Sequence, residues 1–450
     1  MNDDLLRDRL RAHIQKLAAE LPHRGSATLE EARAHQYCAD VLRELGFDPE
    51  AEEFMTTASA YRPFILASGL LLLSYPLFAT YPWLATALAL LVTVSAFMEL
   101  MLLPNLLTWV LPKKLSRNLI ARIPASHKAG QTLIIMSHVD SHRTPWIFRK
   151  PLHFRLYQLL STLAMLAFVG LPLMYGLQQL GMLRFTAVHF APLLMLIAII
   201  FLMTLQAEWS PYTVGANDNA SGVALLLELA RQFRQNPLAH QDVWLVITGC
   251  EEVGAHGSRV FVKNHRNELQ KAAVLVIDNI AGKDTFPCYY RNETMLLPMV
   301  YPEDMVQMAE SVAKAHPELG ARPFSQRGAY TDGTPVLQAG LSCISIVNHT
   351  SSGWIPYWHH PSDTLEHIDW QAYERSVAFI QKLIEQLEKR PPRLEKPWQG
   401  KRANLEACAG FVAEIANCIP GSLRGSAFLY FCHFTSRNNK IVVHIPEKAG

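Results

Sequence analysis

The sequence predicts an α/β protein with a mostly parallel mixed sheet, helices on both faces, and about four transmembrane helices. Short, fully apolar segments alternate with amphipathic helical segments. Strands without polar alternation are typical of a parallel sheet that is buried on both faces. Two long stretches that are almost free of charge interrupt this alternation, and they predict the membrane part.

Composition narrows the class of protein. The 450 residues carry a formal net charge of +2, so nothing indicates nucleic acid as a partner. Seven cysteines without CxxC spacing argue against a disulfide framework and fit a reducing compartment. The first 54 residues are rich in Asp, Glu and Arg and lack an early apolar core, which argues against a signal peptide.

The N-terminal part predicts two helices and a strand. Leucines and isoleucines at helical spacing predict an amphipathic helix over 3–21. Thr28 stands three residues before Glu31, which is the spacing of a capping box, and Gly46 marks the end of this second helix. The segment 47–54 is then expected to be extended.

Two pairs of transmembrane helices are expected. Between Pro63 and Pro112 the only charged residue is Glu99. About 20 helical residues span a bilayer core, so this stretch is long enough for two crossings. Buried helices of a soluble core are the alternative, but such helices seldom run this long without charge. The expected spans are 64–80, 83–103, 156–177 and 188–205.

Lysine and arginine predict the orientation of these spans. Basic residues cluster on the hydrophilic side, whereas the opposite loops offer only Arg184. By the positive-inside rule the hydrophilic part lies in the cytoplasm, so we expect a multi-pass protein of the bacterial inner-membrane type. The basic residues are Arg62, Lys113, Lys114, Arg117, Arg143, Arg149, Lys150 and Arg155.

The remaining chain alternates between expected strands and helices. The strands are expected over 118–124, 132–137, 243–248, 273–277 and 344–347, and the helices over 223–233, 302–316 and 369–389. We therefore divide the chain into N-terminal helices (1–60), a first transmembrane hairpin (61–112), a first part of the catalytic domain (113–150), a second hairpin (151–208), a second part of the domain (209–390) and a C-terminal segment without an assigned role (391–450).

Side chains that bind metals follow several of these strands. His138, Glu251, Glu252 and Asp278 lie at or just beyond strand ends, and Asp218 stands among small residues, GANDNASG, before a helix. Ligands bind at this edge of open α/β sheets. A strand-end Asp is usually a turn former and a loop His is usually solvated, but five groups together are hard to explain in that way. With the adjacent pair Glu251 and Glu252 counted as one group, the fifth group is His359 in WHHPSDT.

These residue types suit a pair of zinc ions. Imidazole and carboxylate are zinc ligands, and two close metals need one shared carboxylate, for which we choose Asp218. Consecutive side chains of an extended segment point in opposite directions. One residue of the pair Glu251 and Glu252 can therefore bind metal while the other acts as general base. Asp140 can accept the second imidazole N–H of His138.

The motifs, taken together, resemble metallopeptidase family 28, the co-catalytic zinc aminopeptidases. HVDS, GANDNASGVA, EEVGAHGS, a strand ending in Asp278, TDGTP and WHHPSDT occur in the family's order. The resemblance covers 17–53, 117–140 and 211–387, and the two hairpins interrupt it. It implies a zinc aminopeptidase-like fold, two Zn²⁺ per chain and a cis peptide between Asp218 and Asn219.

The resemblance also implies roles for the metal ligands. His138 and Asp278 would bind one zinc ion, Glu252 and His359 the other, and Asp218 both. Glu251 would be the general base and Asp140 would support His138. Departures from the family pattern leave His360 as a rival to His359, and they add Asp332 and His256 to the expected substrate pocket.

The expected activity is hydrolysis of N-terminal peptide bonds by a membrane-bound zinc exopeptidase, with a peptide substrate and the lipid bilayer as partners. Alternatives are a dipeptidase or carboxypeptidase, a glutaminyl cyclase-like enzyme, and a silent binding protein on the same fold. The connectors 141–155 and 206–217 join the second hairpin to residues of the expected centre. Their length predicts an active site within roughly 50 Å of the bilayer, facing it.

Overall fold

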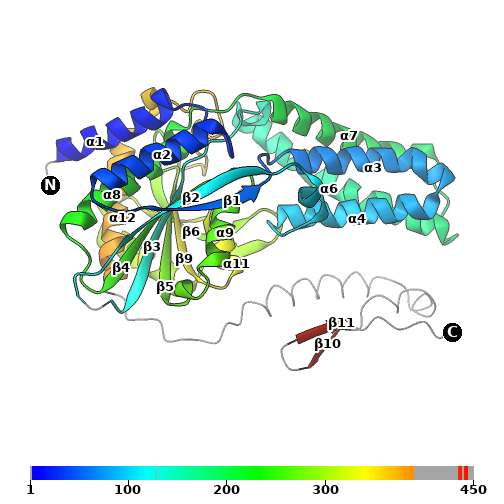
Figure 1. Ribbon diagram of the computed structural model, residues 1–450. Helices are drawn as coiled ribbons and strands as arrows, with labels where there is room; N and C mark the ends of the chain where they lie inside the picture. The colour runs from blue at the N-terminus through cyan, green and yellow to red at the C-terminus, as the bar shows by residue number, and fades with distance from the viewer. Residues whose placement is uncertain (1–2, 128, 390–433, 438–439, 444–450) are drawn as a thin grey trace. The chain divides into compact units, whose positions relative to one another are not determined.

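A computed structural model describes residues 3–127, 129–389, 434–437 and 440–443 (Figure 1). Nine strands form one mixed sheet in the order β1-β2-β4-β3-β5-β9-β6-β7, and β8 pairs with β6. The predicted fold class is confirmed. The strands are β1 (Glu50–Thr56), β2 (Lys114–Ile123), β3 (Gln131–His138), β4 (Gln241–Thr248), β5 (Ala272–Asp278), β6 (Phe286–Thr294), β7 (Pro298–Val300), β8 (Arg322–Ser325) and β9 (Ser342–His349).

Helices cover both faces of this sheet. Figure 1 shows α8 and α12 on one side of the strands and α9 and α11 on the other. The helices of this part are α1 (Asp3–Gln15), α2 (Leu29–Glu44), α8 (Ser221–Gln235), α9 (His256–Asn264), α10 (Glu303–Ala315), α11 (Gly333–Gln338) and α12 (Trp370–Glu388).

The four central strands β4, β3, β5 and β9 are parallel, and the chain reverses direction among them. It passes from β3 through α8 to β4, and then from β4 through α9 back past β3 to β5. Right-handed crossovers in opposite directions leave the sheet on opposite faces. The connections that follow the adjacent strands β3 and β4 therefore diverge, which creates a crevice at the carboxyl ends of this part of the sheet.

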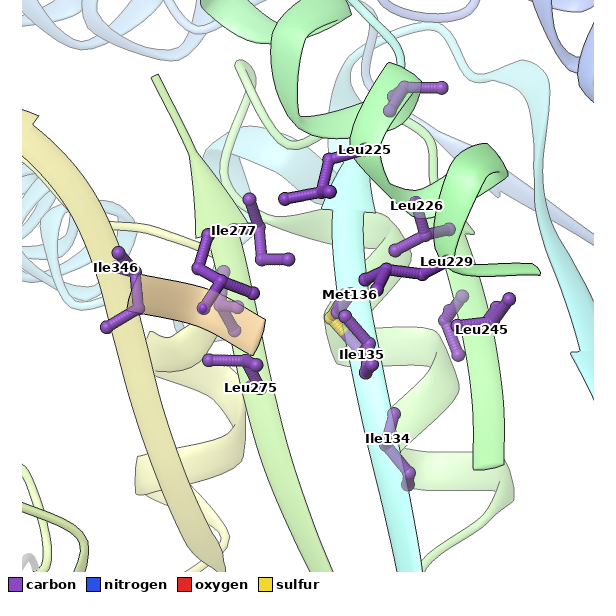
Figure 2. Packing of buried hydrophobic residues seen from close by; sticks show 14 of the residues in the cluster. Ile134, Ile135, Met136, Leu225, Leu226, Leu229, Leu245, Leu275, Ile277 and Ile346 are labelled. Carbon is purple, nitrogen blue, oxygen red and sulfur yellow. The ribbon is translucent and has the colours of Figure 1, made fainter. Parts of the chain in front are cut away.

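The core is formed where α8 packs against these strands. Figure 2 shows Leu225, Leu226 and Leu229 of α8 beside apolar side chains of β3, β4 and β5. All of them are buried. Burying a leucine side chain contributes about 1.5–3 kcal/mol, so this packing fixes the end of α8 that carries the GANDNASG turn.

Four further helices pack beside the sheet domain (Figure 1). They are α3 (Arg62–Thr80), α4 (Pro82–Leu100), α6 (Pro151–Gln179) and α7 (Ala187–Trp209). Each is long and apolar enough to cross a membrane, and only 17% to 33% of the most apolar window of each is buried. Large exposed apolar surfaces mark contact with a partner or a membrane. Two short segments, α5 (Leu106–Val110) and the 3₁₀ turn Trp146–Phe148, lie next to this bundle.

Ion pairs join the helix bundle to the sheet domain. Glu208, near the end of α7, accepts a hydrogen bond from Arg62 Nε at 2.8 Å and another from Ser59 Oγ at 2.5 Å. Arg143 Nη2 lies 3.6 Å from the same carboxylate. A nearly buried carboxylate with two arginines thus fixes the start of α3 against the end of α7.

Most elements match the expected ranges, and the differences lie in short or mixed segments. Thr28 caps α2 by accepting the N–H of Glu31, as the capping pattern predicts. β6, β7 and β8 were not expected, because Pro287 and a polar end break the apolar run of β6. The helices α9 and α11 have at most nine residues, too few for a clear helical period. Of the C-terminal segment, the hairpin β10 (Phe434–Arg437) and β11 (Lys440–Val443) is described, and the rest lies outside the described residues.

Candidate metal centre

Three adjacent strands bring acidic and imidazole side chains to the crevice. His138 is the last residue of β3 and Asp278 the last of β5, while Glu251 and Glu252 follow β4 by three and four residues. These strands are neighbours in the order β4-β3-β5. Their carboxyl ends therefore meet at the position where the crossovers diverge.

Asp218 and His359 reach the same crevice from loops. Asp218 lies in the turn Ala216–Ala220 that precedes α8, and its peptide bond to Asn219 is cis, as the resemblance implies. Gly222 follows, and a Cβ there would lie 2.4 Å from Ser137 Oγ and 2.9 Å from the carbonyl oxygen of Ile277. Glycine thus permits α8 to start directly on the ends of β3 and β5.

The Asp218 carboxylate lies between the two histidines. Its Oδ1 is 3.4 Å from His138 Nε2, and its Oδ2 is 3.3 Å from His359 Nε2. His138 Nε2 is also 3.2 Å from Asp278 Oδ1, and His359 Nε2 is 3.2 Å from Glu252 Oε2. All five side chains are buried. They form two groups, each with one imidazole and one further carboxylate, and the groups share Asp218.

The donor set fits metal ions. Carboxylate oxygens and imidazole nitrogens bind zinc at about 2.0–2.2 Å, and buried polar atoms without partners require an explanation. Four atoms of the centre are buried and have no hydrogen-bond partner: Asp218 Oδ2, Glu251 Oε1, Glu252 Oε1 and His359 Nδ1. Within the described residues, His138, Asp218 and Glu252 form a cluster whose ligand atoms all lie within 4.8 Å of one another.

Burial and repulsion between carboxylates disfavour the ionised form of Glu251 and Glu252 in the centre. Burial raises the pKa of the Glu251 and Glu252 carboxyls well above their usual range, and neighbouring carboxylates add to the effect. Burial alone would lower the pKa of the His138 imidazole, but Asp278, Asp140 and Asp218 raise it well above its usual value. Such strongly shifted groups mark functional sites, and a cation in the crevice would relieve the repulsion.

Asp140 positions the two glutamates. Its carboxylate accepts the backbone N–H groups of Glu251 at 3.1 Å and Glu252 at 3.2 Å, and the hydroxyl of Ser26 at 2.6 Å. His138 Nδ1 lies 3.1 Å from the carbonyl oxygen of Asp140 but 3.5 Å from Oδ1. The backbone carbonyl, rather than the expected carboxylate, is therefore the nearer acceptor for the imidazole N–H. The side-chain alternation used for the expectation ends with β3 at His138.

Two residues that the sequence analysis did not assign hold the Asp218 turn. Asp363 accepts the backbone N–H of Asn217 at 2.7 Å and that of Asp218 at 3.0 Å. Arg24 is fully buried and donates to the carbonyl oxygens of Val139, Val214 and Gly215. WHHPSDT contains Asp363, so its position four residues after His359 was the available signal, whereas Arg24 is too distant in sequence to give one.

Replacing Asp363 by alanine is expected to lower the free energy of unfolding by about 2–5 kcal/mol, because two buried N–H groups would lose their acceptor. The zinc affinity of the protein should fall as well, since the turn that carries Asp218 would loosen. Thermal unfolding in detergent measures the first effect and zinc titration the second. Asp48→Ala, at an exposed position, is the matched control, and equal behaviour of the two variants would contradict the role of Asp363.

A third imidazole lies against the centre. His142 stacks on His359 with ring centroids 3.6 Å apart, and its ligand atoms approach those of His359 and Glu252 within 4.8 Å. Its Nδ1 lies 2.7 Å from the carbonyl oxygen of Arg143, and its Nε2 lies 3.3 Å from the hydroxyl of Tyr61. Burial, together with His359, lowers the pKa of His142 well below its usual value. His142 directly follows HVDS, but no spacing rule identified it.

His360, which was the rival ligand, and the expected pocket residues His256 and Asp332 lie outside the centre. His360 Nδ1 accepts the backbone N–H of Ser362 at 3.0 Å, and His360 belongs to neither group of candidate metal ligands within the described residues. His256 begins α9 and approaches Thr57 at 3.4 Å. Asp332 accepts the hydroxyl of Thr248 and is buried, and burial raises its pKa to about 7. None of the three lines the cavity in front of the glutamates.

Comparisons with known proteins place part of the chain in a known family. Residues 199–384 match the model of peptidase family M28. Aminopeptidase YwaD of Bacillus subtilis is 24% identical over 211 residues, which are 45% of this chain and 45% of that protein. The match thus spans less than half of this curated relative.

Solved structures share the fold. A Zn-dependent exopeptidase from Parabacteroides distasonis has a TM-score of 0.50 at 15% identity, covering 84% of this chain and 97% of that chain. Porphyromonas gingivalis glutaminyl cyclase has a TM-score of 0.52 at 15% identity, covering 85% and 98%. At this identity the likeness concerns the fold alone.

Proposed function

Because the chain carries a domain of peptidase family M28, we propose that it is a membrane-bound, zinc-dependent exopeptidase that hydrolyses N-terminal peptide bonds. The position of the Asp218 carboxylate between His138 and His359, with an oxygen 3.3–3.4 Å from each imidazole, carries this proposal. A shared carboxylate is what a two-metal hydrolase needs. The distant aminopeptidase relative supports the N-terminal direction of cleavage.

Five side chains are proposed to hold two zinc ions. His138 and Asp278 would bind the first, His359 and Glu252 the second, and Asp218 both. When bound, zinc lowers the pKa of water and polarises a carbonyl group. Asp140 is a positioning residue in this scheme, because it fixes the backbone of the two glutamates that follow β4.

Glu251 is proposed to be the general base. It lines the cavity, and its Oε1 is buried without a hydrogen-bond partner. This oxygen can take the proton of the attacking water and then deliver it to the leaving amine. Burial raises the pKa of the Glu251 carboxyl, which makes its carboxylate a stronger base, and proton transfer is fastest when the pKa of the base lies near the working pH.

The four apolar helices are proposed to cross the bilayer, with the sheet domain on the cytoplasmic side. Their exposed apolar faces and the basic residues at their sheet-side ends support this orientation. Glu208 with Arg62 and Arg143 would then lie at the level of the headgroups.

The test of this function is zinc counting and amino-acid release with protein purified in detergent. We expect two zinc ions per chain and release of amino acids from peptides with free N-termini, but not from N-acetylated peptides. Equal action on acetylated peptides would indicate a carboxypeptidase or endopeptidase. One zinc ion and cyclisation of N-terminal glutamine would indicate a cyclase, and no zinc and no release would contradict the proposal.

Removal of zinc by a chelator is expected to lower the midpoint of thermal unfolding. Ligands that bind only the folded state stabilise it by RT ln(1 + [L]/Kd), about 4 kcal/mol at a free concentration of 1,000 Kd. The like charges of Asp218, Glu252 and Asp278 would also repel one another without the ions. Restoring zinc should restore the midpoint, and magnesium should not, because imidazole is a poor magnesium ligand. A midpoint that does not respond to chelation would argue against a zinc centre.

A further inference from the structure

One cavity joins the candidate metal centre to the four apolar helices. It has a volume of about 410 Å³, which lies within the range of ligand pockets. Asp218, Glu251 and His359 line part of it, together with segments of the sheet domain that include Tyr290, Gln326 and Tyr330. Side chains of α3, α4, α6 and α7 line the part that faces the helix bundle. Most of the latter are apolar; examples are Phe97, Phe154, Met165, Phe168, Ile200 and Met203.

Aromatic side chains form a continuous wall from the centre into the helix bundle. Phe148 contacts the His359 ring edge-on, with centroids 4.5 Å apart, and Phe154 of α6 follows at 5.5 Å from Phe148. Phe154 also packs on Trp358, the neighbour of His359, and Met203 of α7 packs against this cluster. The metal centre is therefore not followed by a polar cleft but by an apolar channel.

This channel is longer than an amino-acid side chain. Its lining includes Phe154 and Phe168, which lie fourteen residues apart on α6. At about 1.5 Å per residue they are separated by roughly 21 Å along the helix. The lining also includes the exposed residues Gln158 and Thr162, one helical turn apart on α6. Gly328, in the loop after β8, also lines the channel, and a Cβ there would lie 3.4 Å from Gln158 Nε2. The channel thus reaches the molecular surface between this loop and the first turns of α6, a helix that is proposed to lie in the bilayer.

The chemistry of the wall favours hydrocarbon over an extended peptide. A peptide brings one N–H and one C=O per residue, and each costs free energy in an apolar site without a partner. The hydroxyls of Thr162 and Thr204 already donate to carbonyl oxygens of their own helices. The carboxylate of Glu99 accepts the amide of Asn105 at 2.6 Å. Ser161 Oγ is buried on the same wall without a hydrogen-bond partner, and this single hydroxyl cannot serve the successive polar groups of an extended peptide. A hydrocarbon chain has no hydrogen-bonding groups, so its burial in this wall leaves none of them without a partner.

We propose that the substrate is an amphiphilic amide whose long hydrocarbon chain lies next to the scissile bond and enters the channel from the bilayer. The reacting amide would lie beside Glu251, and the chain would lie between α4, α6 and α7. Hydrolysis breaks the amide C–N bond, adds the water oxygen to the carbonyl carbon and gives the proton to the amine. This inference rests on the proposed function and names its substrate class.

The test uses the full chain in lipid nanodiscs and two series of amides. The first consists of N-alkyl amides of the amino acid that is released most readily from free peptides, and the alkyl group of the leaving amine varies from methyl to hexyl. The second lengthens the side chain of the first residue by the same steps. In whichever series carries the chain that enters the channel, we expect kcat/KM to rise about fourfold with each buried methylene. This factor corresponds to about 0.8 kcal/mol per CH₂.

Two tryptophan variants on α7 test the location. Met203→Trp would fill the channel, whereas Leu202→Trp changes a neighbouring side chain that is 62% exposed on the apolar outer face. Met203→Trp should bring the ratio of hexyl to methyl kcat/KM close to one, and Leu202→Trp should retain the ratio of the unchanged protein. Zinc content and the midpoint of thermal unfolding show whether each variant is folded.

The outcomes separate this inference from the proposed function. If short peptides are cleaved but neither series depends on chain length, or if Met203→Trp retains the ratio, the inference is wrong and the exopeptidase proposal stands. If no amide is cleaved, equilibrium binding of the hexyl and methyl amides to the Glu251→Gln variant decides: tighter hexyl binding supports the inference, and equal binding contradicts it. A phospholipid that copurifies with the unchanged protein but not with Met203→Trp, without any chain-length dependence, would show that lipid fills the channel instead.

Discussion

Replacing Glu251 by glutamine is expected to lower kcat by roughly 10²–10⁴-fold, the usual contribution of a general base. Glutamine has nearly the same shape, so it preserves the packing of the crevice, but its amide cannot take a proton from water. In the described structure Glu251 Oε1 has no hydrogen-bond partner. The substitution at this oxygen therefore removes no hydrogen bond that stabilises the fold. Zinc content should therefore stay at the level of the unchanged protein.

The kinetic measurement needs zinc content from the same samples. Glu303→Gln, at an exposed position in the first turn of α10, is the matched control and should retain full activity. A fall in kcat together with a loss of zinc would make Glu251 a ligand rather than a base. Retention of activity within about threefold would contradict its catalytic role.

Replacing Asp218 by asparagine is expected to have the largest effect on the metal centre. The amide is neutral and presents an oxygen to only one of the two imidazoles, so it cannot serve both groups. Loss of even an outer-shell partner weakens metal binding 10–100-fold, and we expect more than about 100-fold here. The zinc count should fall from two to at most one per chain, with loss of peptide hydrolysis.

Zinc titration with a competing chelator measures this change directly. Asp284→Asn, at an exposed position, is the control. If Asp218→Asn still bound two zinc ions with unchanged affinity, the carboxylate would not be shared, and the assignment of the centre would be wrong. A loss of one ion with the second unchanged would instead place Asp218 in one group only.

The strand ends were predictable because their signals are local. An apolar run that stops at His138 or Asp278 indicates both the strand and a candidate ligand within a few residues. Parallel strands align their carboxyl ends, so the meeting of these groups follows from the fold class. The four apolar helices were predictable for a similar reason, since length and lack of charge are local properties.

The supports of the centre were not predictable in this way. Arg24 contacts carbonyl oxygens more than 100 residues away, and the stacking of His142 on His359 depends on how two loops fold back. The position of the Asp140 carboxylate depends on the end of β3, which the sequence pattern does not define to one residue. The channel depends on packing between α4, α6 and α7, and periodicity alone does not determine that packing.

The second apolar hairpin has a consequence for how the protein is made. It lies between His138 and Asp218 in the chain, so a ribosome that has completed the first proposed ligand must still synthesise α6 and α7 before Asp218 emerges. In the proposed topology these helices are delivered to the bilayer during translation. The proposed centre would then be completed only after both helices of the hairpin have been synthesised and, in that topology, have been delivered to the membrane.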